Sequence, residues 1–147
     1  MVSIHPLREP VDVTEIHGLP YSRSIDAAWD IMIHTFRDSG GTFAPESGVP
    51  LIFIDRYAVG GYVDTLKIPT YADHETIVLQ IAAFIERIPL RIDGSYHYLL
   101  GTWIEGKTIH VDAVRIIDNI DEAFSEAERN REKAIYDFTN TCSLYLP

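Results

Sequence analysis

The sequence predicts an α+β fold in which about three helices pack on a mainly antiparallel sheet. Residues 24–36 repeat apolar side chains with a helical period, and two long β-rich runs flank a Glu-Gly pair at positions 105 and 106. The expected order of helix, strands, helix, hairpin, helix and strands does not alternate strictly enough for a doubly wound parallel sheet. We therefore predict one α+β domain over residues 23–147, preceded by an extended, proline-containing N-terminal arm over residues 1–22.

The first helix is expected to start at Ser24, which can cap it, and to end at the Gly40–Gly41 pair. Asp26 lies in its first turn, where the helix dipole favours a negative charge. The apolar positions trace one face of the helix and are predicted to be buried: Ile25, Ala28, Trp29, Met32, Ile33 and Phe36.

The stretch from Thr42 to Ile68 is predicted to be β-rich, with a short apolar run at Leu51–Ile54. The Gly60–Gly61 pair interrupts its last strand, which indicates a bulge or a close approach of another group to the backbone. A second helix is expected from Asp73 to the residue before Pro89, because the residue preceding proline avoids the helical region. Its inward positions are Val78, Ile81, Ala82, Ile85 and Ile88.

A third helix is expected from Asn119 or Asp121 to about Arg131, and two strands follow at Ala134–Phe138 and Cys142–Leu146. From position 118 to position 137 the chain carries seven acidic and three basic residues. A solvated helix is the simplest interpretation of this charge. A docking face for a basic partner is the alternative, since charge of this kind speeds encounter with an oppositely charged protein.

A β-hairpin is predicted from the runs Tyr96–Ile104 and Lys107–Ile117, with Glu105 and Gly106 as its two-residue loop. Ile104 then lies opposite Lys107, and directly opposed residues share a face of the sheet. One face belongs to the core: Tyr98, Leu100, Thr102, Ile104, Ile109, Val111 and Ala113. The other, which we call the mixed face, holds polar and aromatic side chains: His97, Leu99, Gly101, Trp103, Thr108, His110, Asp112 and Val114.

The mixed face carries the candidate binding residues Trp103, His110, Asp112, His97 and Gly101. The predicted register places Gly101 opposite His110, which leaves a shallow concavity with a titratable wall beside Trp103. Asp112 is expected to orient the imidazole, since it lies two residues along the same face. The alternative is that His110 and Asp112 are ordinary sheet residues and that Trp103 packs under a helix or a neighbouring chain.

Composition restricts the classes of partner. The chain carries 12 basic and 22 acidic residues, a net charge of −10, so its surface repels nucleic acid, whose binding depends on Lys and Arg contacts with phosphate. We expect no direct contact with nucleic acid. No apolar run approaches the roughly 20 residues that cross a bilayer, and the N-terminus lacks a secretory pattern. The single cysteine, Cys142, fits a reducing environment, and we expect a cytoplasmic protein.

No reactive motif is recognised. The six histidines are far apart and no pair of Cys or His has metal-ligand spacing, so we expect no metal. A Gly-x-Ser-x-Gly turn is absent, and Gly60–Gly61 lacks the Lys-Ser/Thr of a phosphate loop. We therefore assign no catalytic residue and no cofactor.

The C-terminal half carries Gly101-Thr102-Trp103, His110-Val111-Asp112, an alanine-rich helix and Ala134-Ile135-Tyr136-Asp137 in that order. This arrangement resembles small uncharacterised proteins of actinobacteria and of their phages and plasmids. The likeness covers residues 25–138 and includes the Gly-Gly stretches at 40–42 and 60–62. It implies a mobile-element protein that acts on a host partner, and it brings no catalytic residue with it.

Two functions follow. The first is a non-enzymatic acidic binding protein, encoded by a phage or mobile element, that modulates or inhibits a host macromolecule. The alternative is a small-molecule-binding protein or small enzyme that uses the His/Asp/Trp patch on the 96–117 hairpin. A homodimer through the mixed face is also expected, because Trp103 leaves apolar surface there that a second chain would cover.

Overall fold

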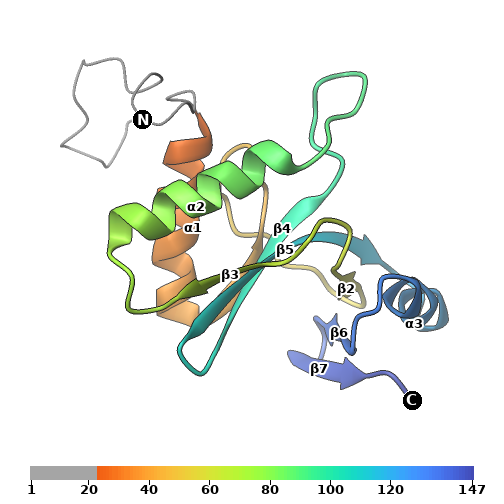
Figure 1. Ribbon diagram of the computed structural model, residues 1–147. Coiled ribbons are helices and arrows are strands. Elements are labelled where there is room, and N and C mark those ends of the chain that lie inside the picture. The colour runs from red at the N-terminus through yellow and green to blue at the C-terminus, as the bar shows by residue number, and fades with distance from the viewer. Residues whose placement is uncertain (1–22) are drawn as a thin grey trace.

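The computed structural model describes residues 23–147, and the predicted arm of residues 1–22 lies outside them. Three helices and an antiparallel sheet make up this part of the chain, which confirms the α+β class (Figure 1). In chain order the elements are α1 (Arg23–Asp38), β1 (Gly40–Phe43), β2 (Tyr57–Val59), β3 (Leu66–Pro69), α2 (His74–Arg87), β4 (Leu99–Glu105), β5 (Thr108–Ile117), α3 (Ile120–Arg129), β6 (Ala134–Asp137) and β7 (Cys142–Tyr145).

The sheet is organised around β5, its longest strand. The strand order is β1-β4-β5-β2-β6-β7, and β3 also pairs with β5. The first half of β5 pairs with β3 and its last three residues pair with β2, all in antiparallel register. One long strand therefore links two parts of the sheet, and β1 and β7 lie at the two ends of the strand order (Figure 1).

Each part of the sheet has its own core. Helices α1 and α2 lie side by side over β1, β4, β5 and β3, where Phe43, Phe84 and Ile109 are buried (Figure 1). Helix α3 packs on β2 and β6, where Val59, Ile117, Ala123, Ala127 and Ile135 form the second cluster. The Tyr62 side chain packs against both clusters and so joins them.

The ends of α2 and α3 follow the sequence. The Asp73 side chain accepts the Thr76 N–H at 2.8 Å and caps α2, whose last residue is Arg87 and whose C-cap is Ile88, the residue before proline. Asn119 accepts the Glu122 N–H at 2.9 Å and caps α3. The apolar run Leu51–Ile54, expected within a β-rich stretch, forms no strand, although Pro50 bridges to Phe43 and the Leu51 N–H donates to the Thr42 carbonyl at 2.8 Å.

The predicted face of α1 is wrong by one residue, about 100° of helix rotation. The buried positions are Ser24, Ala27, Ala28, Ile31, Met32 and Thr35. Ile33 and Phe36 are 41% and 38% exposed, and Trp29 is only partly buried. Hydrogen-bond partners explain why two polar side chains of α1 are buried. The Thr35 and Thr102 hydroxyls lie 2.6 Å apart in the core, and Ser24 hydrogen-bonds to the Glu86 carboxylate, so these side chains are buried without losing hydrogen bonds.

The hairpin register differs from the prediction by two residues. Gly106 and Lys107 form the loop, so Glu105 pairs with Thr108. Gly106 has φ of 61° and takes the first loop position, as in a type II′ turn, whereas a loop at 105–106 would place Glu105 there. A shift of two residues keeps every side chain on its predicted face but changes the partners. Trp103 lies opposite His110, and Gly101 lies opposite Asp112.

Candidate functional site

The Trp103 and His110 rings stack on the mixed face. Their centroids are 4.7 Å apart with an interplanar angle of 3°, and Trp103 is 39% exposed. The His110 Nε2 lies 3.4 Å from a carboxylate oxygen of Glu105. Burial lowers the pKa of His110, against a smaller opposing effect of Glu105, so the imidazole is mainly neutral at pH 7. The stack is a flat aromatic surface rather than a charged site.

Asp112 does not orient His110. Its side chain is 1% exposed, and its Oδ1 accepts the backbone N–H groups of Gly61 and Ala113, each at 3.0 Å. Its Oδ2 has no hydrogen-bond partner of ordinary geometry among the described residues, although the Thr65 hydroxyl weakly favours the ionised form. Burial raises the pKa of Asp112 to about 7, and the nearby Glu132 carboxylate adds to the increase. Asp112 therefore ties β5 to the Gly60–Gly61 segment.

The glycine pair allows this close approach. A Cβ atom at Gly60 would lie 2.2 Å from the Asp112 Oδ2 and 3.3 Å from a Glu132 oxygen. The Gly60 carbonyl also accepts the Asn130 side-chain amide at 2.8 Å. The sequence prediction of a close backbone approach at Gly60–Gly61 is thus confirmed, and the approaching group is a carboxyl.

The expected concavity at Gly101 is filled. Gly101 is buried, and a Cβ atom there would lie 3.0 Å from the Val114 Cγ1. His97 is exposed, contacts the Tyr98 ring edge-on, and donates its backbone N–H to Pro89 beyond the end of α2. The structure brings Trp103 and His110 together, and it places Asp112, Gly101 and His97 in other contacts.

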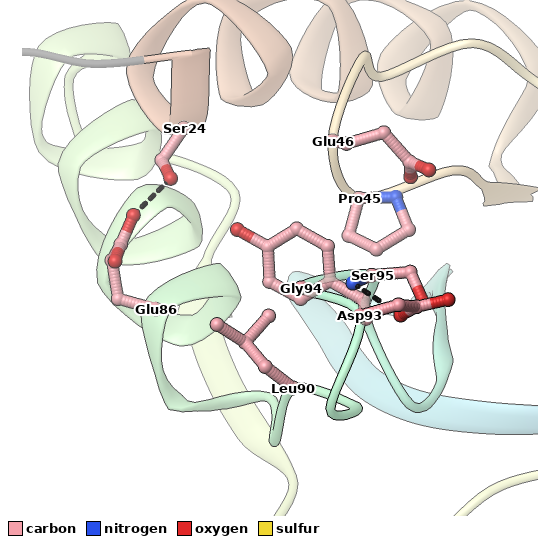
Figure 2. Close-up of a pocket in the computed structure, with 9 residues that line it drawn as sticks. Ser24, Pro45, Glu46, Glu86, Leu90, Asp93, Gly94 and Ser95 are labelled. Carbon is pink, nitrogen blue, oxygen red and sulfur yellow. Dashed lines mark hydrogen bonds between the residues drawn. The ribbon is translucent and has the colours of Figure 1, made fainter.

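A pocket lies between the start of α1, the end of α2 and two connecting segments (Figure 2). Its volume is about 460 Å³. Its lining is acidic and apolar: Ser24, Pro45, Glu46, Glu86, Leu90, Asp93, Gly94, Ser95 and Tyr96. Figure 2 shows Ser24 and Glu86 on one side of the pocket and Pro45, Glu46 and Asp93 on the other.

The three carboxylates of this pocket are exposed and come from different segments. Ser24 donates to Glu86, and the Ser95 backbone N–H and hydroxyl donate to Asp93 at 3.0 and 2.6 Å. The Ser95 hydrogen bonds lower the pKa of Asp93, with a smaller contribution from the charge of Arg91. Within residues 24–147 no Lys, Arg or His forms a salt bridge with Glu46, Glu86 or Asp93. Within the described residues, these carboxylates therefore line the pocket without an ion pair, and the charge of Arg91 acts on Asp93.

The acidic helix α3 is partly neutralised within the domain. Glu126 accepts hydrogen bonds from the Tyr62 hydroxyl, from Arg115 at 3.1 Å and from Arg129. Burial and the Glu126 carboxylate raise the pKa of Tyr62 to about 12. The exposed acids that remain on α3 are Asp121, Glu122 and Glu128. One acid of α3, Glu126, therefore binds Tyr62, which packs against both cores, and the other three acids are exposed on the surface.

Sequence reasoning missed the pocket. Glu46, Glu86 and Asp93 are far apart in sequence, and each looks like an ordinary surface acid. Glu46 follows β1, Glu86 lies on α2 and Asp93 lies between α2 and β4, so only the tertiary structure brings them together and no spacing signal exists.

The chain matches no family model, no characterised protein and no solved structure. Among the described residues, no three His, Cys, Asp or Glu side chains gather as metal ligands would. None of the helices in residues 23–147 has the length and apolar character that a membrane span requires.

Proposed function

We propose that this chain is a non-enzymatic binding protein, encoded by a phage or other mobile element, that modulates or inhibits a host protein. It would do so by binding a basic segment of that host protein. The observation that carries this proposal is the pocket in Figure 2, where three carboxylates that form no salt bridge within the described residues line about 460 Å³ of space. A Lys or Arg side chain has the charge and shape to enter it.

The surroundings of the pocket suit protein recognition. Leu90 lines it with 59% of its surface exposed, and Ile92 in the same loop is fully exposed. Protein interfaces gain most of their affinity from a few anchors in pockets, surrounded by contacts that exclude water. Tyr96 also lines the pocket, and aromatic side chains are among those that contact bound cations. A basic anchor in the pocket and apolar contacts at its rim would together form such an interface.

The geometry gives less support to the alternative, a small-molecule-binding protein or small enzyme on the hairpin. Asp112 is buried and bonded to backbone, the space beside Gly101 is filled by Val114, and His110 is covered by Trp103. A general base must reach its substrate within hydrogen-bonding distance. Here neither His110 nor Asp112 presents a free polar atom to an open cavity.

The test is affinity capture from a lysate of the host, with the wild type and two variants that each lose the same number of negative charges. The pocket variant carries Glu46→Gln, Glu86→Gln and Asp93→Asn. The control variant carries Asp121→Asn, Glu122→Gln and Glu128→Gln on α3. Both remove three negative charges from exposed positions, so a non-specific effect of net charge would be the same in both.

We expect a stoichiometric basic partner that the wild type and the α3 variant capture and that the pocket variant loses. Raising the salt concentration should weaken capture, because the contacts are partly ionic. Loss of the partner in the α3 variant alone would move the interface to α3. Equal loss in both variants would show a non-specific charge effect and contradict the proposal.

A further inference from the structure

Strand β7 leaves one edge of the sheet unpaired. Among the described strands, β6 is its only neighbour. The Leu146 N–H donates to the Lys133 carbonyl, on the β6 side, at 2.9 Å. Backbone groups alternate in direction along a strand, so Leu144 and Cys142 also bond toward β6. The N–H and C=O groups of Ser143 and Tyr145 therefore point away from the sheet.

This edge is short, but it carries no charged side chain or proline that would oppose pairing. Proteins place charged side chains, proline or a bulge on an exposed edge strand, because its free backbone groups are a template for another strand. Residues 139–147 contain no charged side chain, in a chain of net charge −10, and β7 itself has no proline. Two acidic copies of this protein can approach each other here without placing like charges in contact.

Aromatic side chains extend the exposed surface beside the edge. Tyr145 is 74% exposed, and it shares a sheet face with Ser143 and, across the strand pair, with Tyr136. The Tyr136 ring is 37% exposed and contacts Phe138, which in turn contacts Phe53, with centroids 5.1 and 5.2 Å apart. An apolar patch next to a free strand edge is typical of an interaction site.

We propose that β7 pairs antiparallel with β7 of a second copy of this chain and continues the sheet across a two-fold axis. The outward groups of Ser143 then bond to those of Tyr145 in the partner, and reciprocally, which gives about four backbone hydrogen bonds. Leu144 lies at the axis and faces its own copy. Pairing centred on Ser143 would need Thr141 in the strand, and its φ of 49° excludes that.

The second copy is the occupant that the edge fits. An antiparallel pair of identical strands is self-complementary, as a two-fold interface requires. The edge carries no acidic side chain to attract a basic partner. The mixed face of the hairpin is the other candidate for contact between copies, but there the Trp103 ring is already stacked on His110. The tests below separate the two surfaces.

Light scattering on the full chain should give a mass twice the 16.7 kDa of one chain at tens of micromolar protein. Ser143→Pro removes an outward N–H and no bond to β6, so it should give a folded monomer. If that variant does not fold, Ser143→Lys places a charge on the edge and should have the same effect. Trp103→Glu should remain a dimer.

Cross-linking tests the register. In a Cys142→Ser background, Leu144→Cys places two cysteines opposite each other at a non-hydrogen-bonded pair, where Cβ atoms are close enough for a disulfide. Oxidation should give a covalent dimer, whereas Tyr145→Cys in the same background should stay mostly uncross-linked. A monomeric wild type would overturn the proposal. So would a dimer lost on Trp103→Glu but not on Ser143→Pro, or a dimer in which Leu144→Cys fails to cross-link.

Discussion

Replacing Asp112 by asparagine should remove most of the dependence of stability on pH that this carboxyl causes. Asp112 is 1% exposed, and its pKa rises from an ordinary value of 3.8 to about 7 in the folded protein. Between these two values the folded state holds a proton that the unfolded chain releases. The free energy of unfolding therefore falls as pH rises through this window, and it stays low above the folded pKa.

The size of the effect follows from the two pKa values. One pKa unit corresponds to about 1.4 kcal/mol, so the wild type should lose roughly 3 kcal/mol between about pH 5 and about pH 8 through this group. Asparagine keeps a carbonyl that can accept the Gly61 and Ala113 N–H groups, and it carries no charge. Asp112→Asn should therefore be more stable than the wild type at about pH 8, and the difference should shrink at about pH 5.

Urea denaturation of both proteins across this pH range gives the comparison. Groups that do not interact with Asp112 contribute equally to the wild type and the variant, so they cancel in the difference between the two curves, whereas the coupled Glu132 carboxylate does not. The matched control is Asp93→Asn, since the pKa of this exposed carboxyl is lowered and its ionisation does not change above pH 5. Parallel curves for the wild type and Asp112→Asn would refute the assignment of a raised pKa to Asp112.

Three further outcomes are expected. Gly60→Ala should cost about 1–3 kcal/mol in urea denaturation, because its Cβ would displace the Asp112 carboxyl from its backbone partners, and a loss below about 0.5 kcal/mol would contradict the contact. Ile31→Ala should lower the free energy of unfolding by about 2–5 kcal/mol in urea denaturation, and Ile33→Ala by much less, since only Ile31 is buried. The reverse order would favour the face of α1 that the sequence predicted. The purified protein should not retard generic duplex DNA at physiological salt, and a salt-sensitive gel shift would reveal a basic groove that the net charge conceals.

The faces of the hairpin were predictable because the side-chain period of a strand is two. A register error of two residues left all residues of β4 and β5 on their correct faces. The pairing partners depend instead on which residue takes the first loop position. Gly106 adopts positive φ at that position more easily than Glu105 would, which favours a loop at Gly106 and Lys107. That loop places Trp103 opposite His110, where their rings stack.

The buried face of α1 was not predictable from hydrophobicity. Two stripes, offset by one residue, both have helical spacing, and the more apolar stripe contains the exposed Ile33 and Phe36. The stripe that is buried contains Ser24 and Thr35, whose hydroxyls bond to groups more than sixty positions away in sequence. Such partners are known only once the tertiary structure is known, and the same holds for the carboxylates of the pocket.

The central claim is that the acid-lined pocket binds a basic side chain of a protein partner. An NMR titration of the ¹⁵N-labelled chain with a short peptide containing arginine and lysine tests it most directly, with a peptide of the same length containing glutamate as control. We expect saturable, salt-sensitive shifts at Glu46, Glu86 and Asp93 and at their neighbours in the lining, and we expect the Glu46→Gln, Glu86→Gln, Asp93→Asn variant to lose them. Shifts confined to α3, or shifts that persist in that variant, would contradict the claim.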